Sequence, residues 1–454
     1  MSLQSLSNDL LLAIAEWVST TVRRDPYSYG PSSRDCTKSL ASLALVSRHL
    51  NQIATPLLYR TFVQNLYESI PCFIRTLLAK PELRPLVKRL VISEIEESES
   101  MDMLHLSRYD LRKLGVDEQA LEYLEREDAD WIENLEEGKW QAAIALLLLV
   151  LPSIEEIEIV SCRGYGDGFP HMESALAYAA HQQRLRNPGN CLRKLRRVSM
   201  AYCDTEDGMS IGVLLPFCAL PWVTSAKISM ASNEESDVWT VPARARQFNV
   251  EDLEISNSNI APEVLVIILR YFPRLKKLSY DNGGATVGFE DFLPQYLGRG
   301  IAHLHDCLEE LHVFYNEGST TGEEESASIG SLAAFKKLRI LDLQYVCLLK
   351  EDAEGRKPRL VDVLPASLEQ LTIWQCQPDI VVQLRDVLDH RKKGSSFTAL
   401  KAVDIRFAVQ YSRNAKVPLE IIQEMKREEA ELVAYAKEMG VGIKATPREF
   451  INLT

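Results

Sequence analysis

The chain has 454 residues, enough for two or three domains or for one extended array of repeats. Apolar residues make up 46% and charged residues 25%, the balance of an ordinary folded protein, which excludes wholesale disorder. The formal net charge of −13 counts against a dedicated nucleic-acid-binding protein, because a uniformly acidic surface repels phosphate.

The N-terminal segments have the apolar spacing of amphipathic helices. Residues 6–14 read LSNDLLLAI, and residues 39–62 read SLASLALVSRHLNQIATPLLYRTF after a long loop over residues 21–38. Apolar residues cluster on the first segment and recur at steps of three and four through the second, which predicts one helix in each. We expect Thr55 to cap a following turn whose first helical position is Pro56. No basic region precedes the first segment, so we do not expect a secretory signal.

A helical module over residues 1–62 buries little surface by itself, so its spare apolar face is best explained by a partner. The alternative is a helical cap that packs only on the rest of the chain. The two segments resemble the F-box, the short helical module that docks proteins onto the Skp adaptor of a ubiquitin ligase, and the closing PLLYRTF resembles fungal F-box proteins. That family usually has proline where this chain has Ser7. The resemblance implies these adaptor-binding residues: Leu6, Leu10, Leu11, Ile14, Leu40, Leu43, Val46, Leu50, Ile53, Pro56 and Leu57.

The charge of the chain is concentrated in one segment. Residues 63–93 are expected to form a helical connector and a first weak repeat, VKRLVI from Val87. Between Glu94 and Glu137 there are 16 acidic and four basic residues, so nearly the whole imbalance lies there. Punctuating leucines and tryptophans predict short amphipathic helices in an acidic insertion over residues 94–140. Two interpretations stay open: a partly ordered, solvated insertion, or a docking surface for a basic partner.

An apolar run of ten residues, AAIALLLLVL, follows from Ala142 to Leu151. Spanning a bilayer takes about 20 residues, so we predict a buried helix and no membrane association.

A nine-residue frame, aliphatic-x-x-aliphatic-x-aliphatic followed by three residues, recurs over residues 141–410. Its copies begin at Ile154, Leu195, Val223, Val250, Leu275, Leu308, Leu338, Leu368 and Leu400. Alternation in each frame predicts a short strand with one buried face, and amphipathic stretches between frames predict helical returns. We therefore predict an α/β fold: an N-terminal helical module, then a solenoid with a curved parallel sheet inside and helices outside. A charged helix from Pro418 to Gly440 looks like a cap over residues 411–454 that closes the open edge of the last repeat.

The frame resembles the leucine-rich repeat. The ninth position, which that family fills with Asn or Cys, holds Cys162, Cys203, Asn316 and Cys376. The resemblance implies that a small polar side chain there bonds to the backbone of the turn, so we expect structural roles for these cysteines. The nine cysteines are scattered without a CxxC pair, which argues against a disulfide framework or a zinc knuckle. We expect an intracellular protein, cytoplasmic or nuclear or both.

The sequence offers no convincing active site. DNGGATVG at residues 281–288 has glycines but no GK[ST], so it is a poor match to a phosphate-binding loop. His303, His305, Cys307 and His312 invite a metal, but residues two apart on a helix point away from each other. A basic cluster from Arg184 to Arg197 is either a solvated repeat edge or an import signal. We expect no cofactor, no metal and no catalytic activity.

These observations favour a substrate receptor of a Skp–cullin–F-box ubiquitin ligase. The resemblance implies that the N-terminal helices bind the Skp-type adaptor, and through it a cullin, while the repeats bind an unknown protein target. The third, fifth and seventh positions of each frame face the concave surface, and exposed aromatic and arginine residues are typical anchors there. We expect target contacts from Arg197, His312, Phe314, Trp374 and Arg406; for each, a place on a solvated face is the alternative. The alternative function is an interaction scaffold with no degradation target.

Overall fold

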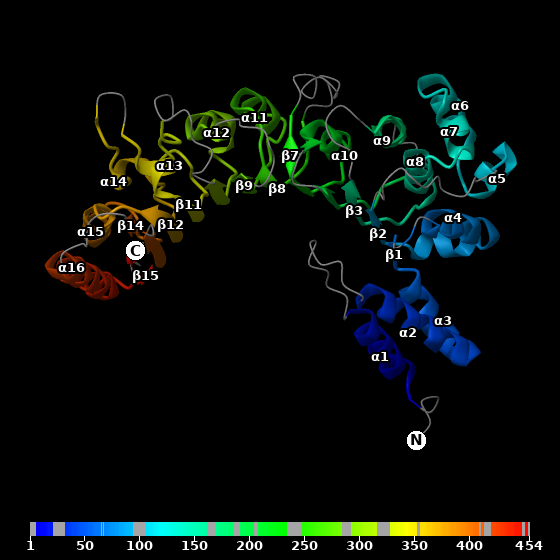
Figure 1. Cartoon of the computed structure of the whole chain (residues 1–454), viewed down its shortest axis with the longest axis horizontal. Coiled ribbons are helices and arrows are strands. Elements are labelled where there is room, and N and C mark those ends of the chain that lie inside the picture. Colours follow the sequence, from blue (N-terminus) through cyan, green and yellow to red (C-terminus); the bar gives the residue numbers. More distant parts are fainter. Residues whose placement is uncertain are drawn as a thin grey trace. The chain divides into compact units, whose positions relative to one another are not determined.

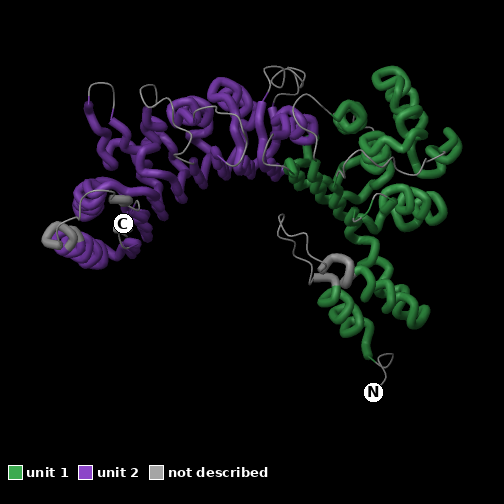
Figure 2. Tube along the Cα trace, in the orientation of Figure 1, with its two compact units in different colours: residues 1–163, 167–203, 220–223 green, residues 164–166, 204–219, 224–454 purple. Residues whose placement is uncertain are grey.

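The computed structural model of the chain describes residues 6–20, 32–64, 66, 68–93, 106–161, 169–184, 191–203, 208–233, 247–283, 292–315, 327–351, 355–407, 410–412, 419–446 and 450–452. It divides into two compact units, drawn in different colours in Figure 2. Unit 1 comprises residues 1–163, 167–203 and 220–223, and unit 2 comprises residues 164–166, 204–219 and 224–454.

Unit 1 begins with three helices and continues as alternating strands and helices. Its elements are α1 (Asn8–Thr20), α2 (Ser32–Val46), α3 (Arg48–Leu58), β1 (Thr61–Val63), α4 (Ser69–Ala79), the 3₁₀ helix η2 (Pro81–Leu86), β2 (Arg89–Ser93), α5 (Arg108–Lys113), α6 (Glu118–Glu127), α7 (Trp131–Glu136), α8 (Trp140–Val150), β3 (Glu156–Ser161), α9 (Pro170–Arg184) and β4 (Arg197–Tyr202). The strands β1, β2, β3 and β4 pair in parallel in that order. The apolar run of the sequence is α8, every residue of which is buried, as predicted.

The described part of unit 2 carries eight strands of one parallel sheet and two short parallel pairs, β5–β7 and β14–β16. Its elements are β5 (Met209–Ser210), the 3₁₀ helix η3 (Ile211–Leu214), α10 (Leu215–Cys218), β6 (Ser225–Ser229), β7 (Ala231–Ser232), β8 (Asp252–Ser258), α11 (Pro262–Leu269), β9 (Lys277–Asn282), α12 (Pro294–Ile301), the 3₁₀ helix η6 (Ala302–Leu304), β10 (Glu310–Tyr315), β11 (Ile340–Gln344), α13 (Tyr345–Leu349), α14 (Leu360–Val363), β12 (Gln370–Cys376), α15 (Ile380–Lys392), β13 (Ala402–Phe407), β14 (Gln410–Ser412), α16 (Leu419–Glu438), β15 (Gly442–Thr446) and β16 (Phe450–Asn452). The strands β6, β8, β9, β10, β11, β12, β13 and β15 pair in parallel in this order. Helices α10, α11 and α12 lie on one side of these strands (Figure 1). The chain is therefore an α/β protein built on parallel strands, as the sequence predicted.

The frame predicts which strand residues are buried. In β10, Leu311 and Val313 are fully buried, whereas Glu310, His312 and Phe314 on the opposite face are partly accessible. The same alternation holds in β3, β4, β9 and β11. It follows from the two-residue period of a strand, in which every second side chain meets the helical layer.

Several strands end in a left-handed residue at the eighth position of the frame. Met230, Asn257 and Gln375 have φ angles of 57°, 48° and 54°. The pairing register shifts at this point in β8 and in β12. Such a bulge ends regular pairing and turns the chain toward the helical side of the sheet.

After the bulges of β8 and β12, the ninth-position residues Ser258 and Cys376 are buried. The thiol of Cys376 donates to the carbonyl oxygen of Ile373 at 3.2 Å, in line with the expected bond to turn backbone. Cys203 is disulfide-bonded, which corrects the expectation drawn from the scattered cysteines. Spacing along the sequence does not decide which thiols meet, because a disulfide needs only that two cysteines lie close in the fold. Cys162 and Asn316 lie outside the described residues.

The C-terminal cap differs from the prediction. Helix α16 does not close the sheet edge; it packs in the helical layer, where the Tyr435 hydroxyl donates to the Asp389 carboxylate of α15 at 2.6 Å. The edge beside β13 is instead paired with β15. The strand was missed because Val441, Ile443 and Ala445 alternate without the leading leucines of the frame.

Candidate functional site

Two serines position the N-terminal helices. Ser7 caps the start of α1, where its Oγ accepts the Leu10 amide at 3.4 Å. Ser47 has an extended backbone, and its Oγ accepts the Leu50 amide at 3.2 Å. This cap splits the predicted second helix into α2 and α3, because an N-cap residue cannot continue a helix. The side-chain amide of Asn51 then donates to the carbonyl of Ala44 at 3.1 Å and links the two helices.

The expected new turn at Pro56 does not form. Helix α3 runs through Pro56 to Leu58, and the Thr55 hydroxyl bonds to the side chain of Asn51 at 3.3 Å instead of capping. Pro56 has no amide to donate to the carbonyl four residues back, and the helix ends two residues later. The loop predicted up to residue 38 is also shorter, since α2 begins at Ser32.

The eleven residues expected to bind an adaptor divide by burial. Leu11, Leu40 and Leu50 form the core of the three helices and are not available at the surface. Leu6, Leu43, Ile53 and Leu57 are partly buried, and Leu10, Ile14, Val46 and Pro56 are exposed. The surface members are thus a subset of the predicted set.

The structure adds apolar surface residues that the spacing argument missed. Leu45 is 86% exposed and Trp17 is 72% exposed, and Leu12 is also exposed. On α1, Leu10, Ile14 and Trp17 follow at steps of four and three, so they share one face. We call the exposed residues Leu10, Ile14, Trp17, Leu45 and Val46 the apolar face of the N-terminal helices. The sequence held one signal for these residues. Helices α1 and α2 contain more apolar residues than one buried face of a helix needs.

A second candidate surface lies on the outward face of the strands in unit 2. Trp374 on β12 donates its indole N–H to the Asp342 carboxylate of β11 at 2.6 Å. Its ring meets Phe314 of β10 edge-on, with centroids 5.6 Å apart. The guanidinium carbon of Arg406 on β13 lies 3.7 Å from the Trp374 ring centroid, and its Nη2 lies 3.1 Å from the Asp404 carboxylate. Three of the predicted target-binding residues are therefore brought together.

The aromatic contact crosses an intervening strand. Phe314 and Trp374 lie on strands separated by β11, a spacing of about 9–10 Å between backbones. Gln344, which pairs with Trp374 in register, is buried and donates its amide to the carbonyl of Tyr315 at 2.7 Å. The two rings reach toward each other across β11 and meet. Edge-to-face and cation–π contacts of this kind contribute about 1 kcal/mol each.

His312 extends the cluster with charged neighbours. Its Nδ1 lies 3.5 Å from the Asp342 carboxylate, and its Nε2 lies 3.8 Å from that of Glu310. Lys277 reaches the same glutamate at 3.7 Å. The strand face from β9 to β13 is therefore an interlocked set of side chains that hold one another in place. We call Phe314, Trp374, Arg406, His312 and Asp342 the strand-face cluster.

Arg197 does not belong to this cluster. It lies on β4 in unit 1, where its guanidinium pairs with Glu156 at 2.9 Å. Arg89 contacts the same glutamate at 3.3 Å and Glu158 at 2.7 Å. These charges are compensated within unit 1.

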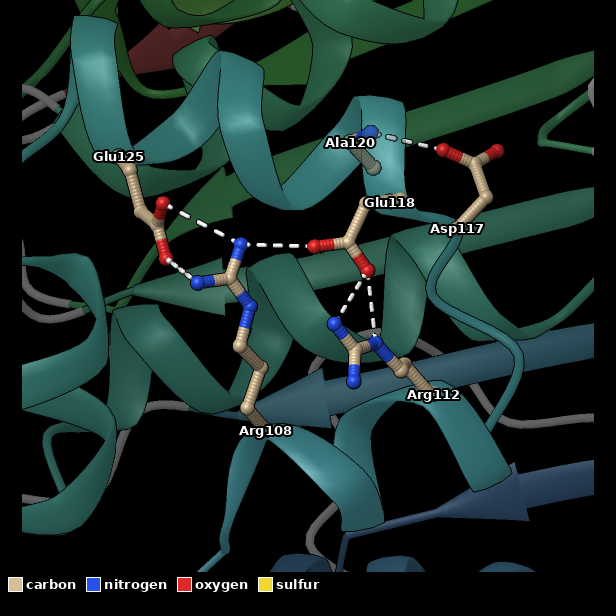
Figure 3. A network of polar contacts seen from close by, with 6 residues as sticks. All are labelled: Arg108, Arg112, Asp117, Glu118, Ala120 and Glu125. Carbon is tan, nitrogen blue, oxygen red and sulfur yellow. Dashed lines mark hydrogen bonds and ion pairs between the residues drawn. The ribbon is translucent and has the colours of Figure 1, made fainter.

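The acidic segment is helical over its described part, as predicted. Leu111, Leu121, Leu124, Trp131 and Leu135 are buried. Figure 3 shows its internal ion pairs: Arg108 bridges Glu118 and Glu125, and Arg112 contacts Glu118. The Arg112 hydrogen bond holds the pKa of the exposed Glu118 carboxyl below its usual value. Because these cations are used internally, the surplus negative charge faces solvent.

Polar contacts fasten the acidic segment to α9. The Asp117 carboxylate accepts the Ala120 amide and the Tyr178 hydroxyl, both at 2.7 Å. His171 lies between Asp128 at 2.7 Å and Asn134 at 2.9 Å, and both His171 and Asp128 are nearly buried. Residues 106–140 are thus a packed part of unit 1 rather than a loosely attached insertion.

The residues considered for a metal do not converge. His305 contacts Asp306 at 3.0 Å, the Cys307 thiol points to backbone carbonyls, and His312 belongs to the strand-face cluster. Within the described ranges, no three His, Cys, Asp or Glu side chains are grouped to hold a metal ion. The glycine-rich residues 284–288 lie outside these ranges, and so do residues 185–190 of the basic cluster from Arg184 to Arg197. Of that cluster the structure describes the side chains of Arg193, Lys194, Arg196 and Arg197, and the Arg197 guanidinium is paired with Glu156. Among the helices that the structure describes, none has the length and apolar character to span a membrane.

No protein-family model matches the chain, and no curated protein matches its sequence.

Proposed function

We propose that the chain is the substrate-recognition subunit of a Skp–cullin–F-box ubiquitin ligase. In this proposal α1, α2 and α3 are an F-box that binds the Skp-type adaptor and through it a cullin. The parallel strands are leucine-rich repeats that bind a protein target on the face opposite the helices. The protein acts in the cytoplasm, the nucleus or both.

The apolar face of the N-terminal helices carries this proposal. The module already has a core in Leu11, Leu40 and Leu50, so Leu45 and Trp17 are not needed to complete it. Surface-exposed leucine and tryptophan on a small helical module are the usual mark of a helix-docking site. Burying a side chain such as Leu45 against a partner gains about 2 kcal/mol. Such a surface fits a partner helix better than it fits solvent.

The strand-face cluster supports the second half of the proposal. Aromatic and arginine side chains held rigid by their neighbours are the usual anchors of protein interfaces. A receptor of this kind acts by proximity: it raises the effective concentration of the target near the ubiquitin-conjugating enzyme. It therefore needs no catalytic residue of its own.

Copurification with a Skp adaptor tests the F-box. The full chain should retain the adaptor, and the exposed-face substitutions Ile14→Asp and Leu45→Asp together should abolish retention without unfolding the protein. Val382→Asp is the matched control, because Val382 is an aliphatic residue on α15 that is also 72% exposed. Failure of the unmodified chain to retain any Skp adaptor would overturn the proposal.

The alternative function is an interaction scaffold, which differs from a receptor in one respect: its bound partner is not ubiquitinated. In a reconstituted reaction with adaptor, cullin and conjugating enzyme, a receptor promotes ubiquitination of its bound partner. Retention of adaptor and partner without ubiquitination would identify a scaffold.

A further inference from the structure

The outward face of β9–β13 carries more carboxylates than cations. The carboxylates at its third, fifth and seventh frame positions are Asp281, Glu310, Asp342 and Asp404, and the cations are Lys277 and Arg406. Both cations are already paired, Lys277 with Glu310 at 3.7 Å and Arg406 with Asp404 at 3.1 Å. The face therefore has surplus negative charge and no uncommitted cation among these positions.

Asp281 is the carboxylate best placed to receive a cation. It lies directly opposite Phe314 in the register of β9 and β10, and both side chains project from the same face. Its carboxylate accepts the backbone amide of Asn257, and burial raises its pKa above the usual value. Within the described part of the chain, Asp281 forms no ion pair. A half-buried carboxylate beside an aromatic ring is the arrangement that binds an ammonium or guanidinium group.

We propose that this face binds a basic, unphosphorylated peptide segment, with a lysine or arginine side chain seated between the Asp281 carboxylate and the Phe314 ring. The inference deepens the proposed function and rests on it for one point, the role of the bound peptide as part of a ubiquitination target. The Phe314–Trp374 pair provides the apolar contact next to the cation. The surplus carboxylates steer the basic segment toward this face.

A phosphorylated segment does not fit the same face. The guanidinium group best placed to meet a phosphate belongs to Arg406, and its plane is stacked on Trp374 while its Nε and Nη2 contact Asp404. A phosphate brought to it would also face the carboxylates of Asp404 and Asp342, and like charges at this range repel. Recognition of the target therefore does not require phosphorylation, and a phosphate within the bound segment opposes it.

Peptide selection against the full chain tests the inference. A random peptide library displayed on phage is selected on the immobilised protein, and selected sequences are synthesised with each lysine or arginine replaced by phosphoserine or alanine. We expect enrichment of lysine and arginine, weaker binding at higher salt, and loss of binding with phosphoserine. Selection of acidic peptides or of no peptide, or undiminished binding of the phosphoserine versions, would contradict the proposal.

Two variants locate the cation. Asp281→Asn keeps the acceptor for the Asn257 amide but removes the charge, and we expect about tenfold weaker binding of the selected peptides. Glu263→Gln, at an exposed position of helix α11, changes the net charge equally and should leave binding unchanged. Phe314→Leu is the second variant, and it should also weaken binding because it removes the aromatic ring. Equal affinities in all three variants would overturn the assignment.

The adaptor assay on the same preparations separates this inference from the proposed function. Cation-selected peptides that need Asp281, together with absence of adaptor retention, would refute the F-box and leave the peptide site standing. Adaptor retention without selection of lysine- or arginine-containing peptides would refute the peptide site and leave the F-box standing.

Discussion

The division of the N-terminal helices into buried and exposed leucines leads to a sharp prediction. Leu11 is 1% exposed and packs inside the three helices, whereas Leu45 is 86% exposed. Leu11→Ala removes a buried side chain and should cost about 2–5 kcal/mol. Leu45→Ala removes only solvated surface and should change the stability by less than about 0.5 kcal/mol.

Hydrogen exchange measures this difference locally, where a global unfolding curve of a two-unit protein would blur it. A loss of about 2 kcal/mol or more raises the equilibrium constant for local opening by about thirtyfold or more. We therefore expect amides of α1 and α3 to exchange much faster in Leu11→Ala and at the native rate in Leu45→Ala. Adaptor binding should respond to the exposed residue. We expect Leu45→Ala to weaken adaptor binding although the protein remains fully folded. Equal exchange in both variants would refute the assignment of core and surface.

Three other predictions concern the remaining structure. Trp374→Phe removes the donor to Asp342 and should lower the stability of unit 2 by about 1–2 kcal/mol, visible as a lower thermal midpoint. Ser47→Ala removes the cap of α3 and should cost about 1 kcal/mol, seen as faster exchange of the first amides of that helix. Burial raises the pKa of the Cys191 thiol to about 12, so iodoacetamide at pH 8 should modify exposed Cys72 but not Cys191 in the folded protein. Because the unfolded thiol ionises first, the contribution of Cys191 to stability is complete below about pH 8.5 and should fall as pH rises from there toward 12. Modification of Cys191 before unfolding would contradict its burial.

The repeating frame made the strands predictable, because a buried aliphatic residue at every second position is a local signature of a half-buried strand. The start of each frame marked β3, β4, β6 and β8–β13, and the amphipathic returns marked helices such as α11 and α15. The break at Ser47 was not predictable from apolar spacing, because the period of three and four continues across the serine. The partner of the last frame strand, β15, was missed because it lacks the frame.

Side-chain placement within the sites was less predictable than the fold. The sequence assigns Phe314 and Trp374 to one face of the sheet, but their contact across β11 depends on side-chain conformations that strand alternation does not determine. Likewise, α1 and α2 have more apolar residues than their core can bury. Which of these residues are buried depends on where α3 packs against the two helices. For that reason Leu11 and Leu45 could not be told apart before the helices were assembled.

Calorimetric titration of the full chain with a purified Skp adaptor tests the central claim most directly. We predict saturable one-to-one binding with a dissociation constant of about 1 µM or tighter, and loss of that binding in the Ile14→Asp, Leu45→Asp variant but not in Val382→Asp. Absence of binding by the unmodified chain, or equal binding by all three proteins, would contradict the account.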